Sequence, residues 1–177
     1  MKTVNILFAG FGGQGVLFAG KVAATSGLIS GLEVSWLPSY GPEMRGGTAN
    51  CSVVLSDEPI GCPIVLTPDI LVAMNAPSYE KFENAVSAGG SLFMDSSLIP
   101  VECGRKDIKV YSVPATKMAK DNGLTGLANI ILLGRVLKET EFIDKQTLIE
   151  ALKKSVPPKK EAMLAKNMEA FELGYNS

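Results

Sequence analysis

The feature that most constrains the fold is a glycine-rich turn between an apolar run and a helix-like segment. The apolar run is Val4-Asn5-Ile6-Leu7-Phe8-Ala9, the turn is Gly10-Phe11-Gly12-Gly13-Gln14-Gly15, and Val16-Leu17-Phe18-Ala19 follows. A strand that is apolar almost throughout is typical of a sheet whose two faces are both covered. A strand, a glycine turn and a helix in this order open a βαβ unit, so the sequence predicts an α/β fold.

The turn has the G-x-G-x-x-G spacing of dinucleotide-binding folds, with Gly10, Gly12 and Gly15 at the three glycine positions. Glycines there let backbone N–H groups approach an anion beside the partial positive charge of a helix start. Such folds also place an Asp or Glu about 20 residues further on to hold the ribose hydroxyls. Residues 38–40 are Pro-Ser-Tyr at that place, and Glu33 stands at the wrong end of the second strand. A dinucleotide site is therefore disfavoured, although the turn remains suited to an anion.

Apolar patterns along the rest of the chain predict alternating strands and helices without a linker or repeat, which indicates a single domain over residues 1–177. The 39–47 loop is expected at the carboxyl end of the second strand, beside the glycine turn, because the first two strands are expected to be neighbours. The amphipathic stripe of the last helix favours packing on the body of the domain over a dedicated partner-binding helix. The predicted strands are 4–9, 33–37, 49–55, 60–66, 69–75, 92–94 and 110–113, and the predicted helices are 15–30, 77–88, 114–122, 127–137, 145–155 and 159–173.

The 39–47 loop reads Ser39-Tyr40-Gly41-Pro42-Glu43-Met44-Arg45-Gly46-Gly47 and has no hydrophobic period. Arg45 is suited to meet a phosphate or a carboxylate on a ligand or on another subunit. An equally weighted alternative is that Glu43 and Arg45 pair locally and shape the loop. Conspicuous loops carry function more often than core positions do, so the loop is a candidate contact site.

Composition excludes several kinds of chemistry and of partner. The 177 residues have a formal net charge of −1 and contain no histidine, which disfavours nucleic acid and anionic membranes and removes His-based catalysis and ligation. Three widely spaced cysteines, Cys51, Cys62 and Cys103, are expected to be free thiols and not cluster ligands. No nucleophile–base constellation is visible. Without a membrane span or a signal-peptide pattern, the sequence predicts a cytoplasmic protein that is not a complete enzyme alone.

The specific blocks Gly10–Val16, Ser39–Cys51 and Ser56-Asp57 resemble the gamma subunit of 2-oxoacid:ferredoxin oxidoreductases. The resemblance continues through Val113-Pro114-Ala115 and Ala128-Asn129 to Asn167 and the segment Ala170–Tyr175, so it covers essentially the whole chain. The form of the 40–47 block is more similar to the 2-oxoglutarate and 2-oxoisovalerate enzymes than to the pyruvate enzyme.

The resemblance implies a complex that oxidatively decarboxylates a 2-oxoacid with thiamine diphosphate and Mg²⁺, forms an acyl-coenzyme A, and passes electrons through [4Fe-4S] clusters to ferredoxin. It places thiamine diphosphate between the alpha and beta subunits and the clusters on beta and delta, with no cofactor held by the gamma chain alone. It links the gamma chain to coenzyme A access.

Together, the residues and the resemblance predict a Rossmann-like three-layer α/β domain. We expect a mostly parallel sheet, a hairpin-like insertion after the second strand and C-terminal helices. The candidate cofactor-binding or subunit-contact residues lie in the two loops: Gly10, Gly12, Gly13, Gln14, Gly15, Ser39, Tyr40, Gly41, Pro42, Glu43, Met44, Arg45, Gly46 and Gly47. A free-standing nucleotide-binding protein or dehydrogenase that uses the 10–15 turn is the alternative.

Overall fold

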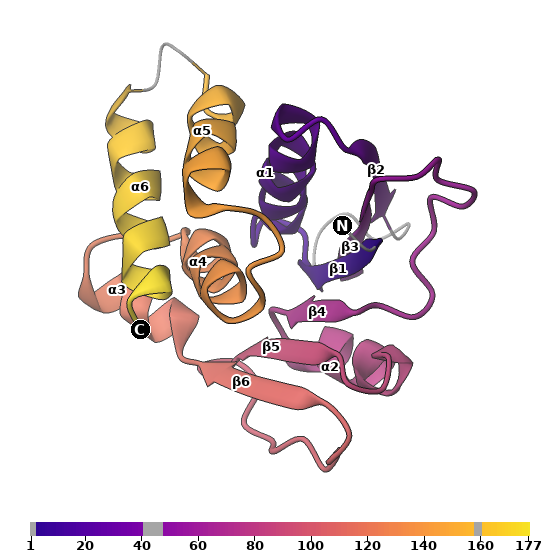
Figure 1. Ribbon diagram of the computed structural model, residues 1–177. Helices are drawn as coiled ribbons and strands as arrows, with labels where there is room; N and C mark the ends of the chain where they lie inside the picture. Colours follow the sequence, from indigo (N-terminus) through magenta and orange to yellow (C-terminus); the bar gives the residue numbers. More distant parts are fainter. Residues whose placement is uncertain (1–2, 41–47, 158–160) are drawn as a thin grey trace.

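The computed structural model describes residues 3–40, 48–157 and 161–177, and these form a six-stranded sheet with helices on both faces (Figure 1). The strands are β1 (Val4–Phe11), β2 (Glu33–Tyr40), β3 (Thr48–Ser56), β4 (Ile70–Ala73), β5 (Ser91–Asp95) and β6 (Lys109–Val113). The helices are α1 (Val16–Ile29), α2 (Ala76–Phe82), α3 (Ala115–Asp121), α4 (Ala128–Thr140), α5 (Lys145–Ser155) and α6 (Glu161–Tyr175), with a 3-10 turn, η1 (Glu83–Ala85).

The strand order is β2-β3-β1-β4-β5-β6. Strands β1, β4, β5 and β6 run parallel, whereas β3 runs antiparallel to both of its neighbours, β1 and β2. The expected α/β fold, the mostly parallel sheet and the hairpin-like insertion are thus confirmed. The expectation that β2 lies next to β1 is wrong, because β3 returns between them and takes the edge of β1.

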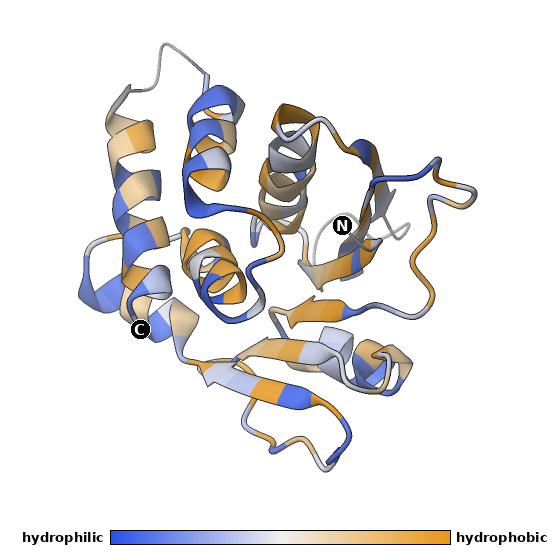
Figure 2. Ribbon diagram, viewed as in Figure 1, coloured by the Kyte–Doolittle hydropathy of each residue, from blue (hydrophilic) through white to orange (hydrophobic). Residues whose placement is uncertain are grey.

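Helices α1, α4, α5 and α6 lie on one side of the sheet (Figure 1), over a buried layer that includes Ile6 and Phe8 of β1. Gly20 of α1 allows this helix to pack closely on the sheet, since a Cβ there would lie 2.2 Å from Sγ of Cys51 on β3. Helix α4 carries both hydrophobic and hydrophilic residues (Figure 2), and its residues 129–134 are all buried. The backbones of α4 and α6 meet through glycines: a Cβ on Gly134 would lie 2.3 Å from the carbonyl oxygen of Phe171.

The packing of α6 on the domain confirms the favoured interpretation of its apolar stripe. Phe171 is buried and Met168 packs against the core of this face. Met163, in the same predicted stripe, is 45% exposed. The C-terminal half of α6 therefore provides the packing.

The opposite face of the sheet is covered by α2, η1 and the segment of residues 57–68. The predicted strand over 60–66 is wrong, since that segment contains no strand or helix. The predicted helix over 77–88 ends early, at Phe82, and is followed by η1. The chain then becomes extended at Val86 (φ −61°, ψ 130°), which is buried in this second core.

Candidate functional site at the carboxyl edge of the sheet

The chain order reverses between β1 and β4. From β1 the chain crosses through α1 toward β2 on one face, and from β4 it crosses through α2 toward β5 on the other. Open α/β sheets bind ligands outside the carboxyl ends of the strands at such a switch point. The glycine turn follows β1 and the residues Met74 and Asn75 follow β4, so both lie at this place.

The glycine turn needs the backbone freedom that glycine provides. Gly13 and Gly15 have φ values of 95° and 74°, in the left-handed region that side chains with a Cβ disfavour. Gly15 is the N-cap of α1 and supplies no side-chain oxygen, and α1 has no acidic residue in its first turn. The N-terminus of α1 is therefore left without a cap from its own side chains, which suits an acceptor group supplied by a ligand or another subunit.

Gln14 ties the two sides of the switch point together. Its Oε1 accepts hydrogen bonds from the backbone N–H of Phe11 (2.6 Å) and from Nδ2 of Asn75 (3.2 Å). Its Nε2 donates to the carbonyl oxygen of Met74 (2.9 Å). The Gln14 side chain thus occupies the crevice between β1 and β4, and a ligand at this edge has to lie beside the amide and not in its place.

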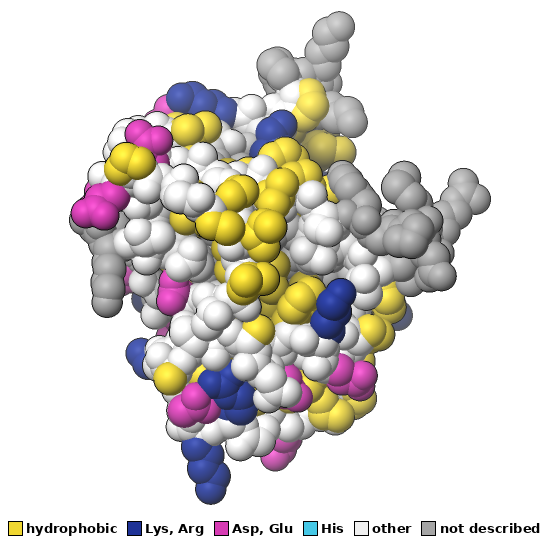
Figure 3. Space-filling view, turned by 90° about the vertical axis from the view of Figure 1, so that its right-hand side faces the viewer, with side chains coloured by type: hydrophobic (Ala, Val, Ile, Leu, Met, Phe, Trp, Pro, Cys, Tyr) yellow, Lys and Arg dark blue, Asp and Glu magenta, His cyan; other side chains and the backbone are white. Residues whose placement is uncertain are grey.

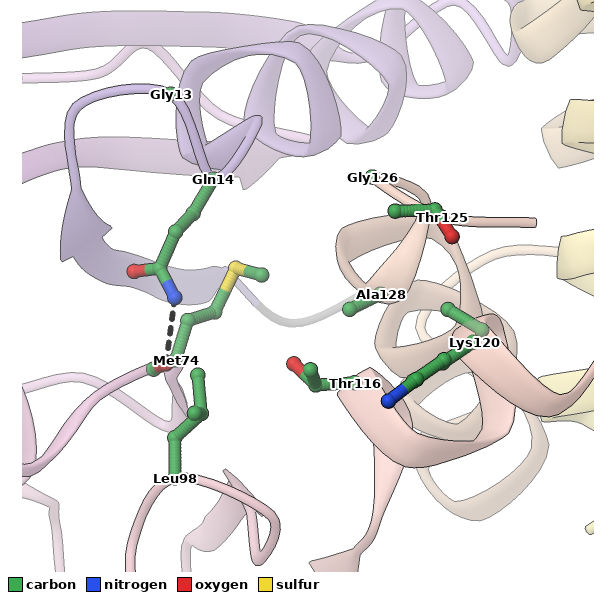
Figure 4. A pocket seen from close by; sticks show the side chains of 10 residues that line it. Gly13, Gln14, Met74, Leu98, Thr116, Lys120, Thr125, Gly126 and Ala128 are labelled. Carbon is green, nitrogen blue, oxygen red and sulfur yellow. Dashed lines mark hydrogen bonds between the residues drawn. The ribbon is translucent and has the colours of Figure 1, made fainter. Parts of the chain in front are cut away.

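A cavity of about 430 Å³ lies on the α4 side of the glycine turn. Figure 4 shows Gln14, Met74 and Leu98 on one side of it, with Thr116 and Lys120 on the other. Among the described residues that line it, Lys120 is the one with a charge. Its full lining is Gly13, Gln14, Met74, Leu98, Thr116, Ala119, Lys120, Thr125, Gly126 and Ala128. A mostly apolar cavity of this size with few polar groups is typical of small-molecule sites.

The wall formed by Thr116 is held by a buried carboxylate at the end of β5. The Asp95 side chain is fully buried and accepts hydrogen bonds from Oγ1 (2.5 Å) and the backbone N–H (3.1 Å) of Thr116. It also accepts one from the N–H of Ser97 (3.1 Å). These bonds fix the start of α3 at the carboxyl edge. Because Thr116 Oγ1 donates to Asp95, it can offer a ligand a lone pair.

A second cavity, of about 280 Å³, lies on the other side of the same turn. Its lining includes Gly12, Leu17 and Phe18 from the turn and the start of α1, together with Ala49 of β3. The glycine turn therefore forms a wall between two hollows, both at the carboxyl edge of the sheet.

The structure brings the described candidate residues to one edge, although not as neighbours. Gly10 of β1 and Tyr40 of β2 pair with the two sides of the same residue, Ala49 of β3, so the ends of β1 and β2 lie one strand apart. Ser39 and Tyr40 end β2 in the place where a ribose-binding acid would be expected. The candidates Gly41–Gly47, and with them the Glu43–Arg45 alternative, lie outside the described residues.

The sequence reasoning missed Asp95, Thr116 and Lys120 as site residues. An Asp at the end of a predicted strand, followed 21 positions later by a Thr at a helix start, was the available signal. Nothing in the sequence pairs these positions, because the contact depends on α3 crossing to the end of β5.

The cysteines are separated in the fold. Cys51 is buried beneath α1, and this burial raises the pKa of its thiol to about 12. Cys62 is exposed and Cys103 partly so, and all three are free. Across residues 3–40, 48–157 and 161–177, no group of three or more acidic, Cys or His side chains is placed to hold a metal ion. In the same ranges, no helix combines the length and apolar character required to cross a bilayer.

The fold and the site define an α/β domain with a glycine turn at the switch point and hollows on both sides of that turn. Comparison with known families matches residues 5–177 to the pyruvate ferredoxin/flavodoxin oxidoreductase model. The chain belongs to this family.

Two relatives illustrate how the domain occurs. The 2-oxoglutarate synthase subunit KorC of Methanocaldococcus jannaschii is 36% identical over 174 residues, which cover 97% of this chain and 91% of that protein. The ketoisovalerate oxidoreductase subunit VorA of Methanothermobacter thermautotrophicus is 38% identical over 172 residues, or 97% of this chain and 35% of that protein. The chain therefore spans about a third of VorA but nearly all of KorC.

Two solved structures have the same fold. The gamma subunit of a keto/oxoacid ferredoxin oxidoreductase from Geobacter sulfurreducens has a TM-score of 0.83 at 28% identity, covering 98% of this chain and 96% of that one. A 2-oxoglutarate:ferredoxin oxidoreductase chain from Magnetococcus marinus, solved with 2-oxoglutarate, coenzyme A and succinyl-CoA bound, has a TM-score of 0.88 at 29% identity. This match covers 99% of this chain and 31% of the Magnetococcus chain.

Proposed function

We propose that this chain is the gamma subunit of a cytoplasmic 2-oxoacid:ferredoxin oxidoreductase, which converts a 2-oxoacid to its acyl-coenzyme A and reduces ferredoxin. The observation that carries the proposal is the family match over residues 5–177. Similarity to KorC and VorA supports 2-oxoglutarate or 2-oxoisovalerate as the substrate of the complex. The proposed partners are the alpha, beta and delta subunits, and ferredoxin through the complex. Three free thiols fit a reducing compartment.

The donor groups of this chain do not fit an iron–sulfur cluster. A [4Fe-4S] cluster takes four thiolates, whereas Cys51, Cys62 and Cys103 differ in burial and the thiol of Cys51 is covered by α1. We therefore assign the clusters, and the thiamine diphosphate with its Mg²⁺, to the other subunits. What this chain contributes is a binding surface.

We assign that surface to the carboxyl edge, where the glycine turn 10–15 faces the partner subunits and the path of coenzyme A, and we propose that residues 39–47 also contact a partner subunit or coenzyme A. The N-terminus of α1 suits an anionic group, and the larger cavity offers apolar walls with the Lys120 ammonium as a cation. Phosphate groups and an extended chain are the chemistry that such a combination accepts. The related Magnetococcus structure was solved with coenzyme A bound, which makes coenzyme A the ligand to test at this edge.

Co-purification from the native source tests the subunit assignment. We expect alpha and beta chains to accompany this protein. A solitary protein with its own turnover, or one that binds NAD(P) or FAD tightly in calorimetric titrations, would favour the nucleotide-binding alternative instead.

Substitution in the assembled complex tests the coenzyme A path. We expect Lys120→Gln to raise the KM for coenzyme A severalfold and leave the KM for the 2-oxoacid unchanged, with Lys153→Gln on the exposed side of α5 as the control. Arg45→Ala is expected to weaken assembly or coenzyme A turnover while the isolated chain stays folded. Equal KM values for coenzyme A in the Lys120 and Lys153 variants would show that the larger cavity is not part of the coenzyme A path.

A further inference from the structure

The face of the sheet opposite α1 is incompletely covered by helices. Within the described ranges, the one α-helix on this face is α2, which packs on β1 and β4 and is 7 residues long. Over β1 and β3 the covering element is the 57–68 segment, whose Val65 packs in the second core with Leu7 and Val54. This part of the molecule is at the right of Figure 1, and Figure 3 looks onto it: hydrophobic side chains form a band across that side.

The 57–68 segment is anchored although it has no regular structure. The N–H of Val65 donates to Oγ of Ser52 on β3 (3.1 Å), and the N–H of Glu58 donates to Oγ of Ser56 (3.1 Å). Just beyond its end, Oδ2 of Asp69 accepts from the backbone N–H of Asn5 (2.9 Å). These bonds hold the segment at its start, in its middle and at its end.

The anchored segment presents large apolar side chains to solvent on both sides of its buried residue. Ile64 is 54% exposed and Leu66 78% exposed, while Val65 between them is 7% exposed. Leu37 of β2, which is 38% exposed, pairs with Ser52 and so points to the same face as the Val65 anchor. We call Leu37, Ile64 and Leu66 the apolar ridge. Solvent alone gives no reason to fix such side chains outward, and exposed apolar patches mark interaction surfaces.

Charge around the apolar ridge has one sign along the chain. Residues 57–69 include Asp57, Glu58 and Asp69 and contain no Lys or Arg. A partner surface that fits the ridge is an apolar recess.

The related proteins indicate which kind of chain supplies that recess. In VorA and in the Magnetococcus chain, this domain makes up about a third of a longer polypeptide, whereas in KorC it is nearly the whole chain. A domain that exists both joined and separate needs a non-covalent interface when it is separate, because the covalent link no longer holds it.

We propose that the apolar ridge, on the face of the sheet opposite α1, is the surface by which this chain docks on a separate subunit that corresponds to the remaining two-thirds of the longer relatives. The proposal rests on the proposed function and adds to it a contact surface away from the glycine turn. The residues of the ridge line neither hollow at the carboxyl edge, so docking through them leaves both open to coenzyme A. The proposal requires that the chain bound to the ridge is this separate subunit and not a second copy of the same chain.

Cys62 provides a test on the unaltered protein, because it is exposed and lies two residues from Ile64. The probe is iodoacetamide, and the modified peptides are quantified by mass spectrometry in the isolated chain and in the purified complex. We expect alkylation of Cys62 to slow on the order of tenfold in the complex, because the core of an interface excludes water. Equal alkylation rates in the two samples would overturn the proposal.

A paired substitution gives the second test. We expect a tagged chain with Ile64→Ser and Leu66→Ser to retain about tenfold less of the partner subunit than the unaltered tagged chain. The control is Leu28→Ser/Met163→Ser, which alters side chains 63% and 45% exposed on α1 and α6. Unchanged thermal unfolding of both variants establishes that they fold.

The outcomes separate the two proposals. Equal retention of the partner by the two variants overturns the ridge while the subunit assignment stands. Failure of the unaltered chain to retain any partner overturns both. If sedimentation shows that the isolated chain dimerises and that only the Ile64/Leu66 variant is monomeric, the occupant is a second copy and the proposal is wrong.

Discussion

The side chain of Asn129 on α4 holds the N-cap residue of α1: its Nδ2 donates a hydrogen bond to the carbonyl oxygen of Gly15 over 3.0 Å. A Cβ added to Gly15 would lie 2.4 Å from that same nitrogen. The glycine is therefore required for two reasons, its left-handed backbone and the closeness of α4.

Gly15→Ala separates these two reasons when compared with Gly31→Ala. Gly31 has nearly the same φ, 75°, but nothing lies within 4 Å of the site of its Cβ. We expect Gly31→Ala to cost about 1 kcal/mol of unfolding free energy from backbone strain, and Gly15→Ala to cost clearly more. Urea unfolding measures both. Adding Asn129→Ala to Gly15→Ala should recover part of the lost unfolding free energy. Equal costs for Gly15→Ala and Gly31→Ala would show that α4 moves away from the added Cβ without a measurable cost.

Gln14→Ala is expected to destabilise the domain by about 1–3 kcal/mol, because it leaves the N–H of Phe11 and the carbonyl of Met74 without their side-chain partner. The matched control is Gln146→Ala, at an exposed position of α5. Thermal unfolding compares the two. Identical midpoints would mean that water replaces the amide at the switch point without loss.

Asp144 gives a pH-dependent prediction. It caps α5 by accepting hydrogen bonds from Thr147. The bond from the Thr147 hydroxyl, and after it the bond from the Thr147 N–H, lower the pKa of the Asp144 carboxyl. A carboxyl whose folded pKa is lowered stabilises the protein above its unfolded pKa of about 4, and this contribution is lost as the pH falls through the folded pKa. Asp144→Ala should therefore cost about 1 kcal/mol near neutral pH and less near pH 3. Urea midpoints at the two pH values measure the difference, with Asp144→Asn as the control that keeps an oxygen cap. A cost independent of pH would refute the assignment.

Thiol reactivity should follow burial. Since burial raises the pKa of Cys51 to about 12, we expect Cys51 to resist alkylation at pH 8.5 in the folded chain while the exposed Cys62 reacts. Peptide mass spectrometry reads the sites. In guanidinium both residues should react alike, and rapid native alkylation of Cys51 would show that α1 detaches readily.

Local patterns predicted individual elements better than their neighbours in the sheet. The predicted helix 145–155 has the bounds observed for α5, and in the structure a local contact, the Asp144 cap, fixes its start. A hairpin-like insertion after the second strand was also predicted, but the expected return strand was 60–66, whereas β3 pairs with β2. The position of β3 beside β1 was not predicted, since pairing across some 40 residues of chain is set by tertiary packing and leaves no local signal.

In the candidate site, too, the local motif was predictable and the contacts between distant residues were not. The glycine turn is visible as a motif, and its strand, turn and helix formed as expected. The role of Gln14 depends on Met74, 60 residues away, and the larger cavity depends on α3 and α4. The apolar run at 60–66 suggested a strand, but Pro59 and Pro63 cannot donate backbone hydrogen bonds and Val65 alone is drawn inward.

The position of β3 between β2 and β1 has a consequence for the order in which the domain folds. Strand β1 is made first, yet its two neighbours are β3 and β4, so it has no partner strand until residues 48–56 have been synthesised. Hairpin β2–β3 closes over a much shorter stretch of chain and is expected to form first. Val53→Ala in the hairpin should then slow refolding, whereas Leu92→Ala in β5 should mainly speed unfolding; the reverse pattern in stopped-flow kinetics would contradict this order. The first strand of the chain thus waits for the hairpin, which supplies the edge on which it assembles.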